Sequence, residues 1–145
     1  PRLQALTDVP FLSMLEAAAK AARDRFSGGT AAVLATRGTL SSGLYQRALE
    51  AEEVPYLIPD EAEQAALMRV IYDGVKADAA PEAYRADLEA VVESISRRGA
   101  GYFILGCTEL PLAAAALGLA APTLDPTEEL AKSAIRWCGF QVKGE

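Results

Sequence analysis

Residues 101–109 read GYFILGCTE, and this stretch decides the fold class. Its apolar run stops at Gly106, and the polar residues Cys107, Thr108 and Glu109 follow. A short, continuously apolar run closed by a glycine is typical of a strand buried on both faces, as in a parallel sheet. The sequence therefore predicts a strand over residues 101–105 and a helix that begins near Thr108.

Three more short apolar runs have the same character, at residues 31–35 (AAVLA), 55–58 (PYLI) and 121–124 (APTL). Between the runs, apolar residues recur at helical spacing. They form three stripes: Leu12, Leu15, Ala19, Ala22 and Phe26; Leu67, Ile71 and Val75; and Tyr84, Leu88, Val91 and Ile95. Strands that alternate with helices predict a single α/β domain over residues 1–145, with a parallel four-stranded sheet flanked by helices in a flavodoxin-like layer sandwich.

Two capping patterns support these helices. Asp60 with Glu63 predicts a capping box at the start of the second stripe. Asp125 and Pro126, with Glu128, predict the same start for a terminal helix over residues 126–142.

Composition excludes several classes of function. The 145 residues are 51% hydrophobic, carry a net charge of −6 and contain no histidine. Without histidine, the chain cannot supply a Ser-His-Asp triad, a Cys-His dyad or a histidine-ligated metal. The acidic balance argues against nucleic acid and anionic membranes as partners. The longest uncharged stretch, residues 110–124, is too short to span a bilayer.

The two cysteines, Cys107 and Cys138, lie too far apart in the sequence for a CxxC pair. In a chain of this composition we expect both to be reduced thiols, as is usual in cytoplasmic proteins. The sequence thus predicts a soluble, cytoplasmic protein.

Polar clusters follow all four predicted strands, at residues 36–39, 59–61, 106–109 and 125–127. The carboxyl ends of parallel strands meet at one edge of the sheet, where ligands of α/β proteins bind beside helix N-termini. The sequence therefore predicts that a small anionic ligand binds among Thr36, Thr39, Cys107 and Thr108.

Each candidate residue also has a structural explanation. A strand-to-helix junction is expected to lower the pKa of Cys107 and to make it a nucleophile or a base, but a small residue can also simply fill that corner. Thr39 could only cap the following helix. Lys76 could only be a cation favoured near a helix C-terminus, and Glu109 only an acid in a first turn. Cys138 and Tyr45 are expected to serve packing.

Five segments together resemble the carboxyl-terminal part of the aspartate/glutamate racemase family. In order, they are AVLATRGT, YLIPDEAEQ, MRVIYDGVKAD, GYFILGCTELPL and PTLDPTEELA, and they lie within residues 31–134. Glutamate racemases usually carry histidine after the GCT motif, whereas this chain has Glu109. The resemblance is therefore greater to aspartate racemases and their relatives.

The resemblance implies a reaction without pyridoxal phosphate or metal. In the family, two cysteines from two lobes face opposite sides of the substrate α-carbon, so that one removes the α-proton and the other delivers a proton. By resemblance, Cys107 is the second-lobe cysteine. Thr36, Thr39 and Thr108 resemble the residues that bind the α-carboxylate and amino group of a small amino acid. Lys76 resembles the lysine that binds the distal carboxylate of aspartate.

The family's amino-terminal lobe, with its own cysteine, has no counterpart in these 145 residues. We therefore expect half an active site that does not racemise aspartate alone. We also expect a homodimer, or a chain that lacks its amino-terminal lobe, because apolar residues of the first and last helices (Leu12, Leu15, Trp137 and Phe140) would otherwise lie uncovered.

Other functions remain open. Related lobes decarboxylate substrates, isomerise dicarboxylates between cis and trans forms or racemise hydantoins. A non-catalytic or truncated lobe that only binds small dicarboxylates is a further alternative.

Overall fold

A parallel sheet of four strands forms the centre of the computed structural model, which describes residues 4–143. The strands are β1 (Ala31–Leu34), β2 (Tyr56–Leu57), β3 (Tyr102–Leu105) and β4 (Thr123–Leu124), in the order β2-β1-β3-β4. All pairs are parallel, and the register places Ala31 opposite both Tyr56 and Tyr102. The sequence prediction of a flavodoxin-like α/β fold is confirmed, with each strand inside its predicted run.

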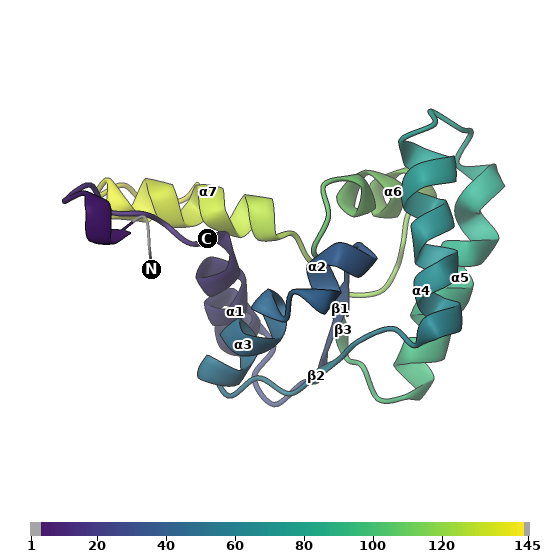
Figure 1. Cartoon of the computed structure of the whole chain (residues 1–145), viewed down its shortest axis with the longest axis horizontal. Coiled ribbons are helices and arrows are strands. Elements are labelled where there is room, and N and C mark those ends of the chain that lie inside the picture. The colour runs from purple at the N-terminus through teal and green to yellow at the C-terminus, as the bar shows by residue number, and fades with distance from the viewer. Residues whose placement is uncertain (1–3, 144–145) are drawn as a thin grey trace.

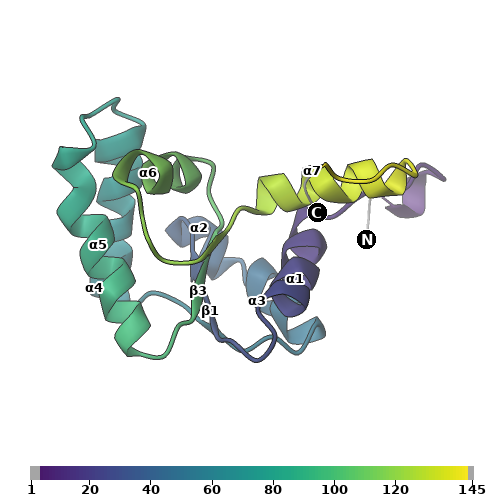
Figure 2. The same cartoon turned by 180° about the vertical axis from the view of Figure 1, so that it is seen from behind.

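Helices cover both faces of the sheet (Figures 1 and 2). On one face lie α1 (Met14–Arg25) and α3 (Leu44–Ala51), and α7 (Pro126–Trp137) packs against α1 and extends beyond the sheet. On the other lie α4 (Glu61–Arg69), α5 (Glu82–Arg97) and α6 (Glu109–Leu117). The 3₁₀ turn η1 (Gln4–Leu6), the short helix α2 (Arg37–Ser41) and the π-helix η2 (Val70–Val75) complete the fold.

Alternation along the strands divides the interior into two cores. Ala32, Leu34, Phe103 and Leu105 pack with α4, α5 and α6. Ala31, Val33, Tyr102 and Ile104 pack with α1 and α3. Both cores are filled because successive side chains of a strand point to opposite faces. Every residue of β1 is 0% exposed, so the continuous apolar run reflects a strand covered on both sides.

One of the two predicted capping boxes is present, and the other helix start differs from the prediction. Asp60 and Glu63 form the predicted capping box of α4. Asp125 does cap α7, but its carboxylate accepts from Thr127 N–H, and Glu128 pairs with Lys132 instead of completing a box. The predicted terminal helix over residues 126–142 was too long, because α7 ends at Trp137.

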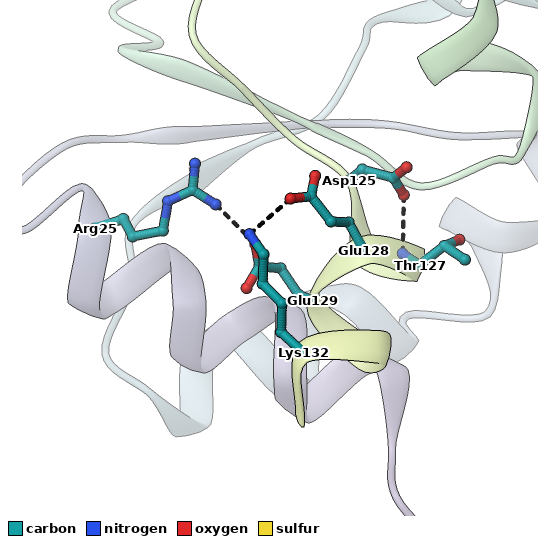
Figure 3. Close-up of polar contacts among 6 residues, drawn as sticks. All are labelled: Arg25, Asp125, Thr127, Glu128, Glu129 and Lys132. Atoms are coloured by element: carbon teal, nitrogen blue, oxygen red, sulfur yellow. Dashed lines mark hydrogen bonds and ion pairs between the residues drawn. The ribbon is translucent and has the colours of Figure 1, made fainter. Parts of the chain in front are cut away.

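Two buried carboxylates join elements that are distant in the sequence. Glu63 accepts hydrogen bonds from Ser94 at 2.7 Å and Arg98 at 2.6 Å, which ties α4 to α5. Glu129 accepts from Arg25 at 2.7 Å and from Lys132 at 3.0 Å, which ties α7 to α1 (Figure 3). Each carboxylate is nearly enclosed and has cationic partners, as buried charges require.

Within residues 4–143, the helices are too short or too polar to cross a bilayer.

Candidate functional site

The carboxyl ends of β1 and β3 lie against each other. Gly106 N–H donates to the carbonyl of Leu34 at 2.7 Å, and a Cβ on Gly106 would lie 3.2 Å from the Cβ of Ala35. Thr36 directly follows Ala35, and Cys107 directly follows Gly106. The structure therefore brings the polar clusters after these two strands to the same edge of the sheet, as the parallel arrangement requires.

Cys107 is partly exposed and lies between β3 and α6. Its thiol donates a hydrogen bond to Glu109 Oε2, with Sγ and Oε2 2.6 Å apart. Burial, followed by this carboxylate, raises the pKa of Cys107 to about 11. The expectation of a lowered pKa was wrong, because desolvation and a neighbouring negative charge outweigh the N–H of Glu109 at the helix start.

Glu109 links three of the predicted site residues. Besides the Cys107 thiol, it accepts from the Thr108 hydroxyl at 3.1 Å, and its Oε1 lies 3.6 Å from Lys76 Nζ. The hydrogen bond from the Cys107 thiol is the main reason why the pKa of Glu109 is lowered. This carboxylate is thus more than a first-turn acid: it joins a thiol, a hydroxyl and an ammonium group.

Lys76 directly follows the π-helix η2. Its N–H donates to the carbonyl of Ile71, five residues back, and π-helical turns of this kind are frequent at functional sites. Gly74 permits the turn to pack closely, since a Cβ there would lie 2.6 Å from Cδ1 of Tyr84. The ammonium lies 4.4 Å from the ring centroid of Tyr72. With a side chain 43% exposed, Lys76 can reach a ligand.

Thr36 and Thr39 form a second hydroxyl cluster, at the end of β1. Their hydroxyls share a hydrogen bond at 2.9 Å, and Thr36 also accepts from Thr39 N–H at 3.3 Å. Thr36 is therefore the cap of α2, and Thr39 is not a cap. Beside them, Arg37 forms a two-pronged ion pair with Glu61 of α4, at 2.7 and 2.8 Å.

Sequence reasoning missed two residues near this edge. Tyr45 on α3 was expected only to pack, yet its ring lies over Gly106, next to Cys107. Gln64 on α4 is 5% exposed, and its amide donates to the carbonyl of Ala35 at 3.1 Å. Gln64 could have been noticed as a polar residue on the apolar stripe of Leu67 and Ile71. No comparable signal in the sequence marked Tyr45.

The part of the chain that the structure describes brings together no group of three or more His, Cys, Asp or Glu side chains that could hold a metal ion. Cys138 is exposed at the end of α7. At the sheet edge, the contacts of Glu109 with the Cys107 thiol and the Lys76 ammonium provide groups for proton transfer and charge pairing.

Known proteins resemble this chain in sequence. A family model described as Asp/Glu/Hydantoin racemase matches residues 1–134. A curated relative, an uncharacterised protein from the pnlA 3′ region of Pectobacterium carotovorum subsp. carotovorum, is 36% identical over 107 residues, which is 72% of this chain and 70% of that protein.

Solved structures show the same fold. A candidate Asp/Glu racemase from Yersinia pestis superimposes with a TM-score of 0.81 and 26% identity, over 93% of this chain and 59% of that one. An aspartate racemase from Picrophilus torridus superimposes with a TM-score of 0.70 and 26% identity, over 94% of this chain and 56% of that one. An aspartate racemase homologue from Pyrococcus horikoshii OT3 superimposes with a TM-score of 0.82 and 24% identity, over 95% of this chain and 60% of that one. This likeness shows the shared fold.

This chain thus spans 56–60% of the length of these three solved proteins. The family match nevertheless covers nearly the whole of it. The chain belongs to the Asp/Glu/Hydantoin racemase family.

Proposed function

We propose that this chain supplies one side of the active site of a cofactor-independent amino-acid racemase whose substrate is aspartate. The observation that carries the proposal is the contact of Cys107 with Glu109, which in turn faces Lys76. Inversion at an α-carbon needs an acid and a base on opposite faces. The Cys107 thiol can give or take a proton at the edge of the sheet where we expect the ligand. It therefore provides either the acid or the base.

Cys107 is suited to the role of acid. Because its pKa is raised to about 11, the thiol holds its proton at neutral pH. After a base on the opposite face has removed the α-proton, Cys107 gives its S–H proton to the α-carbon and the electron pair stays on sulfur. In the reverse direction the same thiolate takes the α-proton. In this proposal the opposite thiol belongs to another lobe, as the family resemblance implies.

Lys76 supports an acidic amino acid as the proposed substrate. Its ion pair with Glu109 is long, at 3.6 Å, and the ammonium is partly exposed to water, so the pair contributes little. A distal carboxylate can therefore compete for the ammonium at small cost. Thr36, Thr39 and Thr108 supply hydroxyls that can bind the α-carboxylate and amino group.

Ligand protection of Cys107 tests substrate binding. The chain is treated with iodoacetamide with and without aspartate, and carbamidomethylation of each cysteine is measured by mass spectrometry. We expect aspartate to slow modification of Cys107 and to leave the exposed Cys138 unchanged. Lys76→Met should abolish the protection. If aspartate does not protect Cys107, or protects both cysteines equally, the proposed binding site is wrong.

Isotope exchange tests the half-site. In D₂O, we expect this polypeptide alone to leave the L:D ratio of aspartate unchanged by chiral chromatography. Any α-deuteration, measured by NMR, should be lost in Cys107→Ala. Interconversion of L- and D-aspartate by the chain alone would contradict the half-site proposal. Protection by aspartate with no Cys107-dependent exchange would favour the non-catalytic binding lobe.

The apolar face at α1 and α7 supports association of two copies. Trp137 is 64% exposed, Phe140 71% and Leu12 38%, whereas Leu15, on α1, is partly buried against the core. A groove of ≈ 610 Å³ lies between α1 and α7, with Leu12 and Trp137 in its lining. Exposed apolar patches of this kind drive association. We expect light scattering to give twice the mass of 15.3 kDa, and a clean monomer would refute the homodimer.

A further inference from the structure

Tyr72 places an aromatic ring against the ammonium of Lys76. The Nζ of Lys76 lies 4.4 Å from the centroid of the Tyr72 ring, within the range at which a ring face attracts a cation. The two residues are four apart in the sequence, a spacing that puts side chains on one face of a helix. Val70, Ile71 and Gly74 of η2 are buried, whereas Tyr72 is 47% exposed. Tyr72 and Lys76 therefore share the exposed side of this helix.

A second group approaches the same ammonium from another helix. Glu109, in the first turn of α6, has its Oε1 3.6 Å from Lys76 Nζ, and its Oε2 accepts from the Cys107 thiol. The ammonium therefore lies between the ring of Tyr72 and the carboxylate that contacts the thiol. A lysine side chain is long and flexible, so it loses more entropy than most when it is fixed. Contacts that fix it beforehand reduce the cost that a ligand must meet.

The two contacts differ in their effect on a bound anion. Glu109 is itself an anion, so it competes with a ligand carboxylate for the ammonium. A ring face attracts a cation through its quadrupole and carries no net charge. A ligand carboxylate can therefore bind the ammonium while the ring contact persists. Tyr72, unlike Glu109, can hold Lys76 in place when the ligand is bound.

We propose that Tyr72 is a positioning residue for Lys76: its ring holds the ammonium where it receives the distal carboxylate of an acidic amino acid. Tyr72 acts through Lys76 and takes no part in proton transfer. Its effect is to favour acidic over uncharged amino acids. The inference rests on the proposed function for its ligand, but the contact between Tyr72 and Lys76 can be tested without one.

A spectroscopic measurement tests the contact. The chain contains four lysines, so labelling with ¹³Cε-lysine gives four ε-methylene NMR signals, and that of Lys76 is assigned by its loss in Lys76→Arg. Protons above the face of an aromatic ring shift upfield. We therefore expect the Lys76 signal upfield of the others in the parent and in Tyr72→Phe, and among the others in Tyr72→Leu. Lys20, on α1, should keep its signal throughout. A Lys76 signal that lies among the others in the parent, or that does not move in Tyr72→Leu, would overturn the proposal.

Paired variants test the role in binding. The concentration of aspartate that halves the rate at which iodoacetamide modifies Cys107 is measured in the parent, Tyr72→Phe and Tyr72→Leu. Phenylalanine keeps the ring, so Tyr72→Phe should match the parent. Loss of a partly exposed contact between a cation and a ring should raise this concentration about two- to fivefold in Tyr72→Leu. Circular dichroism melting checks that both variants fold, which we expect because Tyr72 is half exposed.

Asparagine separates positioning from general damage to the site. An amide replaces its distal carboxylate, so we expect asparagine to protect Cys107 to the same extent in the parent and in Tyr72→Leu. An equal loss of protection for both amino acids would overturn the proposal. Equal protection by aspartate in the parent and in Tyr72→Leu would also overturn it, as would an equal loss in Tyr72→Phe and Tyr72→Leu. If aspartate does not protect Cys107 in the parent, the proposed function is wrong, and the Lys76 signal still decides whether Tyr72 holds the ammonium.

Discussion

The two ends of strand β3 are built from the same residue types, a buried tyrosine ring packed on a glycine. At the amino end, Tyr102 stacks on Phe26 with ring centroids 4.1 Å apart, and a Cβ on Gly29 would lie 3.4 Å from its Cε1. At the carboxyl end, the ring of Tyr45 lies on Gly106. Both hydroxyls are buried without a partner among the described residues, and burial raises the pKa of each to about 12.

The ends differ in what surrounds the two rings. Burial alone shifts the pKa of Tyr102, whereas Cys107 and Asp125 add to the shift at Tyr45. The polar residues belong to segments that follow β3 and β4, and parallel strands send all such segments to one edge. The comparison shows that a tyrosine ring packed on a glycine stacks on another aromatic ring at the amino end of β3, whereas at the carboxyl end it lies near polar residues of the proposed site.

The largest effect is expected on the free energy of unfolding, when a methyl group is added at the carboxyl end of β3 and compared with one added at the amino end. Gly106→Ala drives a Cβ into the ring of Tyr45 and the Cβ of Ala35, and such overpacking costs about 1–3 kcal/mol. Gly101→Ala meets nothing closer than the carbonyl oxygen of Thr30, at 3.9 Å, and should change the free energy of unfolding by less than about 0.5 kcal/mol. Urea denaturation measures both. Equal losses would show that the carboxyl end is not the tighter of the two.

The second effect concerns the negative charge beside the thiol. Glu109→Gln removes a carboxylate that raises the pKa of Cys107, so the pKa should fall, although burial still holds it above the ordinary value. If the pKa falls by about one unit, the fraction of thiolate rises about tenfold, but each thiolate is less nucleophilic. The net result is about threefold faster modification by iodoacetamide. Glu128→Gln, in the first turn of α7, is the matched control and should leave the rate unchanged. A slower rate in Glu109→Gln would contradict the assigned role.

A smaller effect is expected in alkaline stability. The folded-state pKa of Cys107, about 11, lies above the ordinary thiol value, so the folded chain keeps a proton that the unfolded chain releases. The resulting stabilisation is complete below the ordinary pKa and is lost as the pH rises through the folded-state pKa. Urea denaturation over this alkaline range should show a shallower loss of stability in Cys107→Ser than in the parent. Cys138→Ser, at the exposed cysteine, should follow the parent, and identical slopes in all three would be evidence against the raised pKa.

The smallest effect has the opposite sign to that of Glu109→Gln. Lys76 lowers the pKa of Cys107, but its effect is smaller than those of burial and of Glu109. Lys76→Met should therefore slow modification of Cys107 in the free chain by less than about twofold. Lys20→Met on α1 is a control cation distant in the sequence and should have no effect. Faster modification in Lys76→Met would mean that the ammonium acts on the thiol mainly through Glu109.

Much of the fold, and the edge of the sheet that carries the site, could be predicted from residues close together in the sequence. The apolar runs at 31–35 and 101–105 gave strands because a strand buried on both faces needs continuous apolar residues. Asp60 and Glu63 predicted a capping box because both hydrogen bonds of that motif are local. The site edge was predicted for the same reason, since polar residues follow each strand directly.

The errors had one local and one distant cause. Thr36 and Thr39 are both able to cap a helix, and the residue at which α2 begins makes Thr36 the cap. The pKa of Cys107 was assigned the wrong direction, because the helix start is visible in the sequence but the burial of the sulfur is not.

The sequence alone determined the order of strands and helices, their parallel arrangement and the edge at which polar residues gather, because periodicity, caps and chain direction are local properties. Only the tertiary structure decided that Cys107 holds its proton, that Lys76 meets Glu109 and that the ring of Tyr45 packs on Gly106. Desolvation and charge pairing depend on which remote segments come into contact, and α3, η2 and α6 become neighbours of the site only when the sheet has assembled.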